Sequence, residues 1–160
     1  MQIKFLLDSS NPITGEASIE IDKPIEEVYA FIGDNFFENY PKWAVEVVEF
    51  EPESKTVCVG AKAKQVRKDN GELVESVFEI TRYAPPSQLT CQGLTAPYRQ
   101  SYLLEEKEKE KTSTRLTFRF ELLELEMFMR PFQKLIRYAI EDGAESTVEN
   151  IKNLIDVNYS

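Results

Sequence analysis

Apolar residues recur every three or four positions through the last part of the chain, from about Arg130 to Ile155. This spacing predicts an amphipathic helix with one wide apolar stripe. Pro131 suits the first turn of such a helix, where its missing N–H would have no partner. A helix of this kind cannot bury its stripe alone, so we expect the rest of the chain to form a surface that receives it. The stripe consists of Phe132, Leu135, Ile136, Ala139, Ile140, Ala144, Thr147, Val148, Ile151 and Leu154.

One strand and two shorter helical segments are predicted near the N-terminus. Residues 13–21 alternate between apolar and polar, as a half-buried strand does. Asp22-Lys23-Pro24 marks a helix start and Gly33 a natural stop. Residues 1–12 form either an N-terminal extension or an edge strand. A brief second helix or turn, broken by Pro41, is predicted for the aromatic-rich segment with Phe36, Phe37, Tyr40 and Trp43.

The middle of the chain reads as a series of strands separated by turn residues. The Asn70-Gly71 pair is a strong hairpin signal, and Pro85-Pro86 ends a strand. One face of each strand is apolar and the other polar, which is typical of an antiparallel sheet covered on one side. We therefore predict an α+β fold, in which a curved antiparallel sheet of about six to seven strands grips the long C-terminal helix, with two short helices after the first strand. Besides residues 13–21, the predicted strands are Val45–Glu51, Ala61–Lys68, Leu73–Tyr83, Gln88–Gly93, Tyr98–Glu105 and Ser113–Leu123, and Lys55–Val59 is a candidate for one more short strand.

Composition narrows the function classes. The 160 residues suffice for a single domain spanning 1–160. The net charge is −9, from 28 acidic and 19 basic residues, which argues against nucleic acid and against docking on anionic membranes. No apolar run is long enough to span a bilayer, and Phe5-Leu6-Leu7 is too short for a signal-peptide core. We expect a cytoplasmic protein.

The chain contains no histidine. It therefore lacks the usual proton shuttle and the commonest zinc ligand, and we expect neither a metal site nor a cofactor. Its two cysteines, Cys58 and Cys91, form no CxxC pair, and we expect each to be a small buried apolar residue.

Six short motifs follow one another along the chain: Ala17–Ile32, Trp43, Val59-Gly60, Tyr83–Leu89, Ser113–Thr117 and Val148–Leu154. In this order they resemble the START-like (SRPBCC) helix-grip superfamily. That superfamily includes the polyketide cyclase/dehydrase and lipid-transport proteins and proteins of the birch-pollen-allergen type. The resemblance covers roughly residues 13–156. It implies the predicted fold, but it does not choose among carriers, cyclases, hydrolases and co-chaperone modules.

The resemblance also implies a cavity between the concave face of the sheet and the long helix. Most of its expected lining is apolar, and the alternative is that these side chains simply pack a core. Polar residues that bind the ligand would be those that alternation places on the same strand face as apolar neighbours, unless a β-bulge turns them to solvent. The apolar and aromatic candidates are Tyr40, Trp43, Phe78, Phe118, Phe120, Phe128, Phe132, Ile136 and Ile140. The polar candidates are Ser76, Gln92, Gln100 and Tyr102.

Three functions remain open. The first is binding or carriage of a hydrophobic small molecule, such as a lipid, an isoprenoid or an aromatic compound. The second is a polyketide cyclase or aromatase, for which Tyr102 is the one weak catalytic candidate, because a phenol is a poor base unless its pKa is tuned. The third is a co-chaperone-like protein-interaction module with a filled cavity. No pair of residues indicates a reaction, so the sequence favours the non-catalytic binder.

Overall fold

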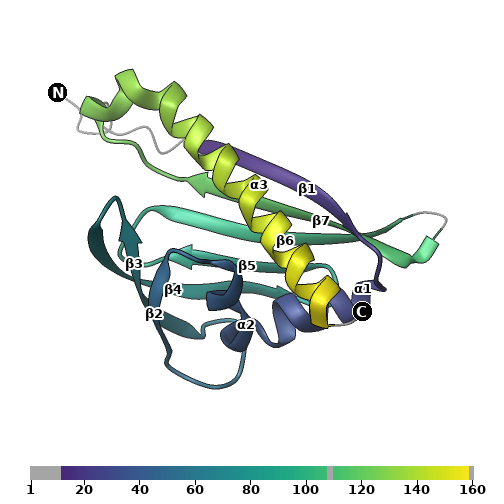
Figure 1. The fold of residues 1–160 in the computed structure, drawn as a ribbon. Coiled ribbons are helices and arrows are strands. Elements are labelled where there is room, and N and C mark those ends of the chain that lie inside the picture. The colour runs from purple at the N-terminus through teal and green to yellow at the C-terminus, as the bar shows by residue number, and fades with distance from the viewer. Residues whose placement is uncertain (1–11, 108–109, 159–160) are drawn as a thin grey trace.

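Seven strands form one antiparallel sheet in the computed structural model, which describes residues 12–107 and 110–158 (Figure 1). Their order across the sheet is β1-β7-β6-β5-β4-β3-β2 once the strands are numbered along the chain. The predicted α+β class with a long C-terminal helix is confirmed. The strands are β1 (Ile13–Ile21), β2 (Val47–Pro52), β3 (Lys62–Asp69), β4 (Glu72–Ala84), β5 (Gln88–Gly93), β6 (Tyr98–Lys107) and β7 (Glu110–Leu122).

Local sequence accounts for the hairpin between β3 and β4. Asn70 and Gly71 both have positive φ, at 51° and 83°. Positive φ at both central residues is the requirement of a type I′ turn, whose twist matches that of the strands it joins. The predicted turn between these strands is therefore confirmed. The possible edge strand at residues 1–12 lies almost entirely outside the described residues.

The helical segments are α1 (Ile25–Tyr29), the π-helical turn η2 (Ala30–Asp34), α2 (Phe36–Trp43), the 3-10 turn η3 (Met127–Phe132) and α3 (Gln133–Asn158). Gly33 does not end the first helix, because the chain continues through the π-helical turn. Pro41 lies inside α2 rather than breaking it, since its aromatic neighbours are buried in the core. Pro131 lies in η3, so the α-helix begins three residues later than expected.

The segment between β2 and β3 corrects two predictions. Residues 55–59 form bends and a turn instead of a short strand. Val57 alone of these five residues is buried, and Cys58 is exposed rather than buried. Because Val57 alone packs into the core, the segment has no buried face to hold against the sheet, and it runs as a loop from β2 to β3 although no described strand pairs with the outer edge of β2. Cys91, on the central strand β5, is fully buried as expected.

Helix α3 runs across the inner face of the sheet alongside β1 (Figure 1). Its buried residues, Ala144, Val148, Ile151 and Ile155, lie in the middle and the C-terminal part of the helix. Close approach to β1 occurs at Gly15, where an added Cβ would lie 2.6 Å from Cγ2 of Ile140. Among the described residues, no helix is both long enough and apolar enough to cross a membrane.

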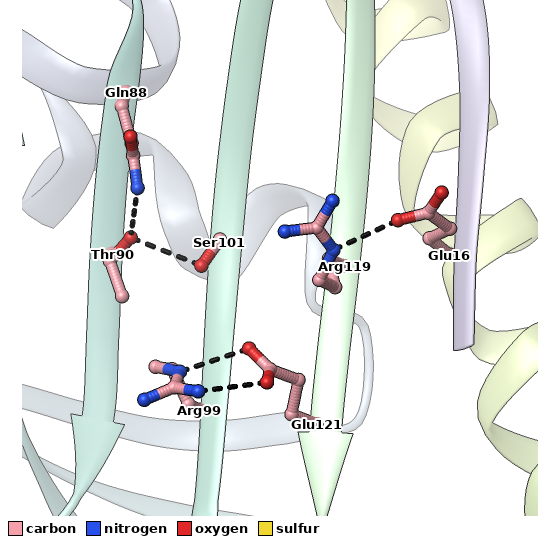
Figure 2. A network of polar contacts seen from close by, with 7 residues as sticks. All are labelled: Glu16, Gln88, Thr90, Arg99, Ser101, Arg119 and Glu121. Atoms are coloured by element: carbon pink, nitrogen blue, oxygen red, sulfur yellow. Dashed lines mark hydrogen bonds and ion pairs between the residues drawn. The ribbon is translucent and has the colours of Figure 1, made fainter. Parts of the chain in front are cut away.

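The outer face of the sheet is polar. Figure 2 shows Arg99 donating to both carboxylate oxygens of Glu121 at 2.9 and 2.8 Å, and Arg119 donating to Glu16 at 2.9 Å. Thr90 and Ser101 share a 3.0 Å hydrogen bond on the same face. This pattern confirms the alternation predicted for the strands, with apolar side chains kept for the face that α3 covers.

Candidate functional site

A cavity of about 620 Å³ lies between α3, α2 and the inner face of the sheet. Its sides combine apolar residues from β7 and α3 with polar residues from β3, β6 and α2. Exposed lining residues such as Val45 and Ser146 show that it opens to solvent along the gap between α2 and α3. The lining consists of Tyr40, Trp43, Ala44, Val45, Glu46, Arg67, Gln100, Tyr102, Phe118, Phe120, Ile136, Ala139, Ile140, Gly143, Ala144, Ser146, Thr147 and Asn150.

A buried chain of hydrogen bonds supports the cavity on its β3 side. The hydroxyl of Tyr40 donates to Oε1 of Gln65 at 2.8 Å. Nε2 of Gln65 then donates to the hydroxyl of Ser76 at 3.3 Å. All three side chains are buried, so these bonds satisfy polar groups that water cannot reach. The chain fixes the orientation of the Tyr40 ring in the cavity wall.

A second hydrogen bond ties α2 to β6. Nε1 of Trp43 donates to the hydroxyl of Tyr102 at 3.2 Å, and both side chains are almost fully buried. Nδ2 of Asn150 donates to the backbone carbonyl of Trp43 at 3.1 Å, which links α3 to the same point. Trp43 therefore connects the helix, the sheet and the cavity wall.

Gln100 on β6 differs from these neighbours. It is 6% exposed and lines the cavity. Its side chain lies close enough to the Tyr40 hydroxyl and the Cys91 thiol to offset part of the rise in their pKa, but its Nε2 makes no hydrogen bond of good geometry among the described residues. A buried donor without a partner costs about 1–3 kcal/mol relative to a satisfied one. Such a group in a native structure needs an explanation, and a ligand atom in the cavity is one.

Burial keeps the phenols of the cavity protonated. It raises the pKa of Tyr40 to about 12 and holds the pKa of Tyr102 well above its usual value. Both side chains can therefore donate hydrogen bonds at neutral pH, but neither can act as a base there. This limits the catalytic role considered for Tyr102 to that of a donor.

Two charged residues at the cavity were not predicted from the sequence. Arg67 lies 3.9 Å from a carboxylate oxygen of Glu46 and 3.7 Å from one of Asp69, and both Arg67 and Glu46 line the cavity. Strand alternation could have identified Arg67, because it lies on the same face of β3 as the buried Ala63 and Gln65. Arg67 is the one cationic side chain among the described residues that line the cavity.

The structure brings together eight of the thirteen predicted ligand-binding residues: Tyr40, Trp43, Gln100, Tyr102, Phe118, Phe120, Ile136 and Ile140. Ser76 and Phe78 are buried behind this wall and do not line the cavity. Gln92 is in register with Glu79 and Arg99, which places it on the outer face. Phe128 and Phe132 are exposed near the start of α3 and lie outside the cavity.

The described residues hold no group of three or more His, Cys, Asp or Glu side chains that could bind a metal ion. The polar groups at the cavity are side-chain amides, phenols, hydroxyls, the guanidinium of Arg67 and the carboxylate of Glu46, and they lie among apolar walls. Such a set can orient an uncharged or anionic oxygen and surround a hydrophobic body.

Comparison with known proteins relates the chain to one family and to several solved structures. The family described as polyketide cyclase/dehydrase and lipid transport matches residues 12–156. A protein from Thermus thermophilus has a TM-score of 0.73 at 16% identity, with 92% of this chain and 99% of that chain covered. A START superfamily protein from Mycobacterium smegmatis has a TM-score of 0.70 at 12% identity, with 91% and 98% covered.

A third structure is the di-domain ARO/CYC BexL from the BE-7585A biosynthetic pathway. It has a TM-score of 0.68 at 14% identity, with 92% of this chain and 48% of that chain covered. No curated protein matches the chain at a significant level. At these identities the solved structures establish a shared fold, and the functional argument rests on the cavity.

Proposed function

The chain belongs to the polyketide cyclase/dehydrase and lipid-transport family, and we propose that it binds a hydrophobic small molecule in the cavity beneath α3. The ligand is a lipid, an isoprenoid or an aromatic compound that carries a hydrogen-bond acceptor. Its apolar body lies against the side chains of β7 and α3, and its acceptor faces β6.

The observation that carries this proposal is the unpartnered amide of Gln100. Its Nε2 is buried in the cavity wall, where a carbonyl, hydroxyl or carboxylate oxygen of a ligand would satisfy it. Tyr102 lies two residues along the same strand face, about 7 Å away at the usual rise of a strand. Because its hydroxyl accepts a hydrogen bond from Trp43, it can donate its own proton to the same ligand.

The size and walls of the cavity fit this class of ligand. Sites for small molecules typically have volumes of about 300–1,000 Å³ and a few polar groups among apolar ones. Here the volume is about 620 Å³. Phe118, Phe120, Ile136 and Ile140 supply the apolar surface, and the ring of Phe120 is backed by the ring of Tyr98 at a centroid distance of 5.5 Å.

Cyclase-type chemistry is the alternative at the same site. It would need a base in the cavity, and both phenols stay protonated because burial raises their pKa. The carboxylate of Glu46 is the remaining candidate, but it is exposed and lies 3.9 Å from the guanidinium of Arg67. Binding without turnover therefore fits the cavity better.

Trp43 provides the test, since it is the one tryptophan of the chain and lies in the cavity wall. We expect cis-parinaric acid, a fluorescent fatty acid that absorbs tryptophan emission, to quench Trp43 saturably at one molecule per chain. Gly143 lines the cavity and an added Cβ there would meet nothing within 4 Å, so Gly143→Leu should fold normally, narrow the site and weaken the quenching. Gly143→Ala is the matched control and should keep the quenching. Quenching that does not saturate, or that survives Gly143→Leu unchanged, would refute the proposal.

A further inference from the structure

The start of α3, together with η3, presents a surface that the cavity does not use. Five large apolar side chains there are about half to two-thirds exposed: Met127 at 49%, Phe128 at 69%, Phe132 at 50%, Leu135 at 66% and Tyr138 at 56%. Apolar exposure on this scale in one segment marks an interaction surface rather than scattered surface residues. We call it the η3–α3 patch and include in it the three basic residues Arg130, Lys134 and Arg137.

The charge of the η3–α3 patch is opposite to that of the whole chain. Residues 127–140 contain three basic residues and no acidic one, whereas the chain as a whole carries −9. Acidic residues resume at Glu126 and Glu141, so the positive stretch has sharp ends. All three basic side chains are exposed. The overall charge argued against anionic membranes, but salt screens distant charges, so the basic side chains on the patch itself weigh more at a docking surface than the acidic residues elsewhere on the protein.

We infer that the η3–α3 patch docks on the surface of an anionic lipid bilayer. Exposed Phe, Leu, Met and Tyr side chains next to Lys and Arg are the composition with which interfacial helices bind such surfaces. The apolar side chains enter the boundary between headgroups and acyl chains, and the basic side chains contact anionic headgroups. The segment lies on the membrane and does not cross it.

The charge of the patch also favours a bilayer over a second copy of the chain as the partner that binds there. A twofold dimer through this patch would place the same surface on both sides of the interface. Arg130, Lys134 and Arg137 would then face their own copies, and like charges brought together across an interface are unfavourable. An anionic lipid surface instead supplies the opposite charge.

The η3–α3 patch continues into the cavity. Phe132 precedes Ile136 by four residues and Ile136 precedes Ile140 by four, so the three share one side of the helix. Ile136 and Ile140 line the cavity while Phe132 is exposed. Docking through Phe132 would therefore bring the cavity close to the lipid surface. Docking itself does not depend on the proposed ligand, and it can be tested separately.

The test is co-sedimentation of the full chain with vesicles. We expect binding to vesicles of phosphatidylcholine with about 30% phosphatidylserine, weaker binding to phosphatidylcholine alone, and a loss of binding at high salt. Because each basic side chain near the surface contributes roughly a fivefold gain, Arg130→Gln/Lys134→Gln/Arg137→Gln should lower the partition coefficient about a hundredfold. The control Lys55→Gln/Arg82→Gln/Arg115→Gln removes three exposed basic side chains on other surfaces and should bind like the wild type.

A second pair of variants tests the apolar contribution. Phe128→Ser/Phe132→Ser should weaken binding to the anionic vesicles, while Leu73→Ser/Leu94→Ser, at similarly exposed positions, should not. All four sites are about half exposed or more, so thermal unfolding should change little. Equal binding to anionic and neutral vesicles, or no effect of the triple Gln variant, would overturn the inference. A concentration-dependent dimer that Phe128→Ser/Phe132→Ser dissociates would overturn it too, by assigning the patch to a second copy.

Discussion

The sharpest prediction contrasts two buried glutamines that differ in one respect. Gln100 and Gln65 are 6% and 2% exposed, and both face the interior of the sheet. Gln65 accepts from Tyr40 and donates to Ser76, whereas Nε2 of Gln100 has no partner among the described residues. Substitution by methionine keeps the length of the side chain and removes the amide from both. The two variants should therefore change stability in opposite directions.

The magnitudes follow from hydrogen bonding. Gln100→Met removes an unsatisfied buried donor and should raise the unfolding free energy of the unliganded protein by about 1–3 kcal/mol. Tyr40 keeps Gln65 as its acceptor in that variant. Gln65→Met leaves the hydroxyls of Tyr40 and Ser76 without this partner and should lower the unfolding free energy by about 1–3 kcal/mol.

Gln100→Met should weaken ligand binding even though it stabilises the unliganded protein. The variant loses one hydrogen bond to the ligand, and affinity for cis-parinaric acid should fall about 2- to 10-fold. Urea unfolding followed by Trp43 fluorescence, with and without the probe, measures both effects on one sample. If Gln100→Met destabilised the unliganded protein as much as Gln65→Met and left the affinity unchanged, the amide would be a structural group and the reasoning would fail.

Three further predictions concern other parts of the molecule. Gly15→Ala places a Cβ 2.6 Å from Cγ2 of Ile140 and should lower the unfolding free energy in urea by about 1–3 kcal/mol, so an unchanged midpoint would contradict the close packing of α3 on β1. Arg99 lowers the pKa of Glu121, so this pair stabilises the fold above the ordinary carboxyl value of about 4.5 and the contribution is lost as the pH falls through the lowered pKa. The melting temperatures of the wild type and Glu121→Gln should therefore converge between about pH 6 and pH 3, and a constant gap would contradict this. One thiol per chain, the exposed Cys58, should react rapidly with Ellman's reagent and the buried Cys91 only in urea, whereas two equally fast thiols would show that β5 is accessible.

Much of the fold could be predicted from local sequence patterns that keep the same secondary structure in the folded protein. The alternation in residues 13–21 and the Asn70-Gly71 pair depend on neighbours close in sequence, and both were predicted correctly. Gly33 and residues 55–59 were not predicted correctly, because the sequence does not show whether a helix continues as a π-helical turn or whether a short alternating segment packs one face into the core.

The inward-facing residues of the candidate site were predicted correctly where a long strand shows a clear alternation of apolar and polar positions. Gln100 and Tyr102 share the ten-residue strand β6 with the buried Leu104, so their inward direction follows from alternation. Gln92 lies in the six-residue strand β5, where too few residues define the pattern, and its side chain faces outward. Phe132 continues the stripe of α3, but a helical stripe does not show where the sheet that covers it ends.

The central claim is that the cavity beneath α3 holds a hydrophobic small molecule. Native mass spectrometry of the wild type and of Gly143→Leu, each titrated with cis-parinaric acid, tests it most directly. The account predicts one bound molecule per wild-type chain and a lower occupancy on Gly143→Leu at the same probe concentration, because the leucine adds four carbon atoms, about 120 Å³ at roughly 30 Å³ each, to a site of about 620 Å³. Equal occupancy of the two proteins, or none on the wild type, would contradict it.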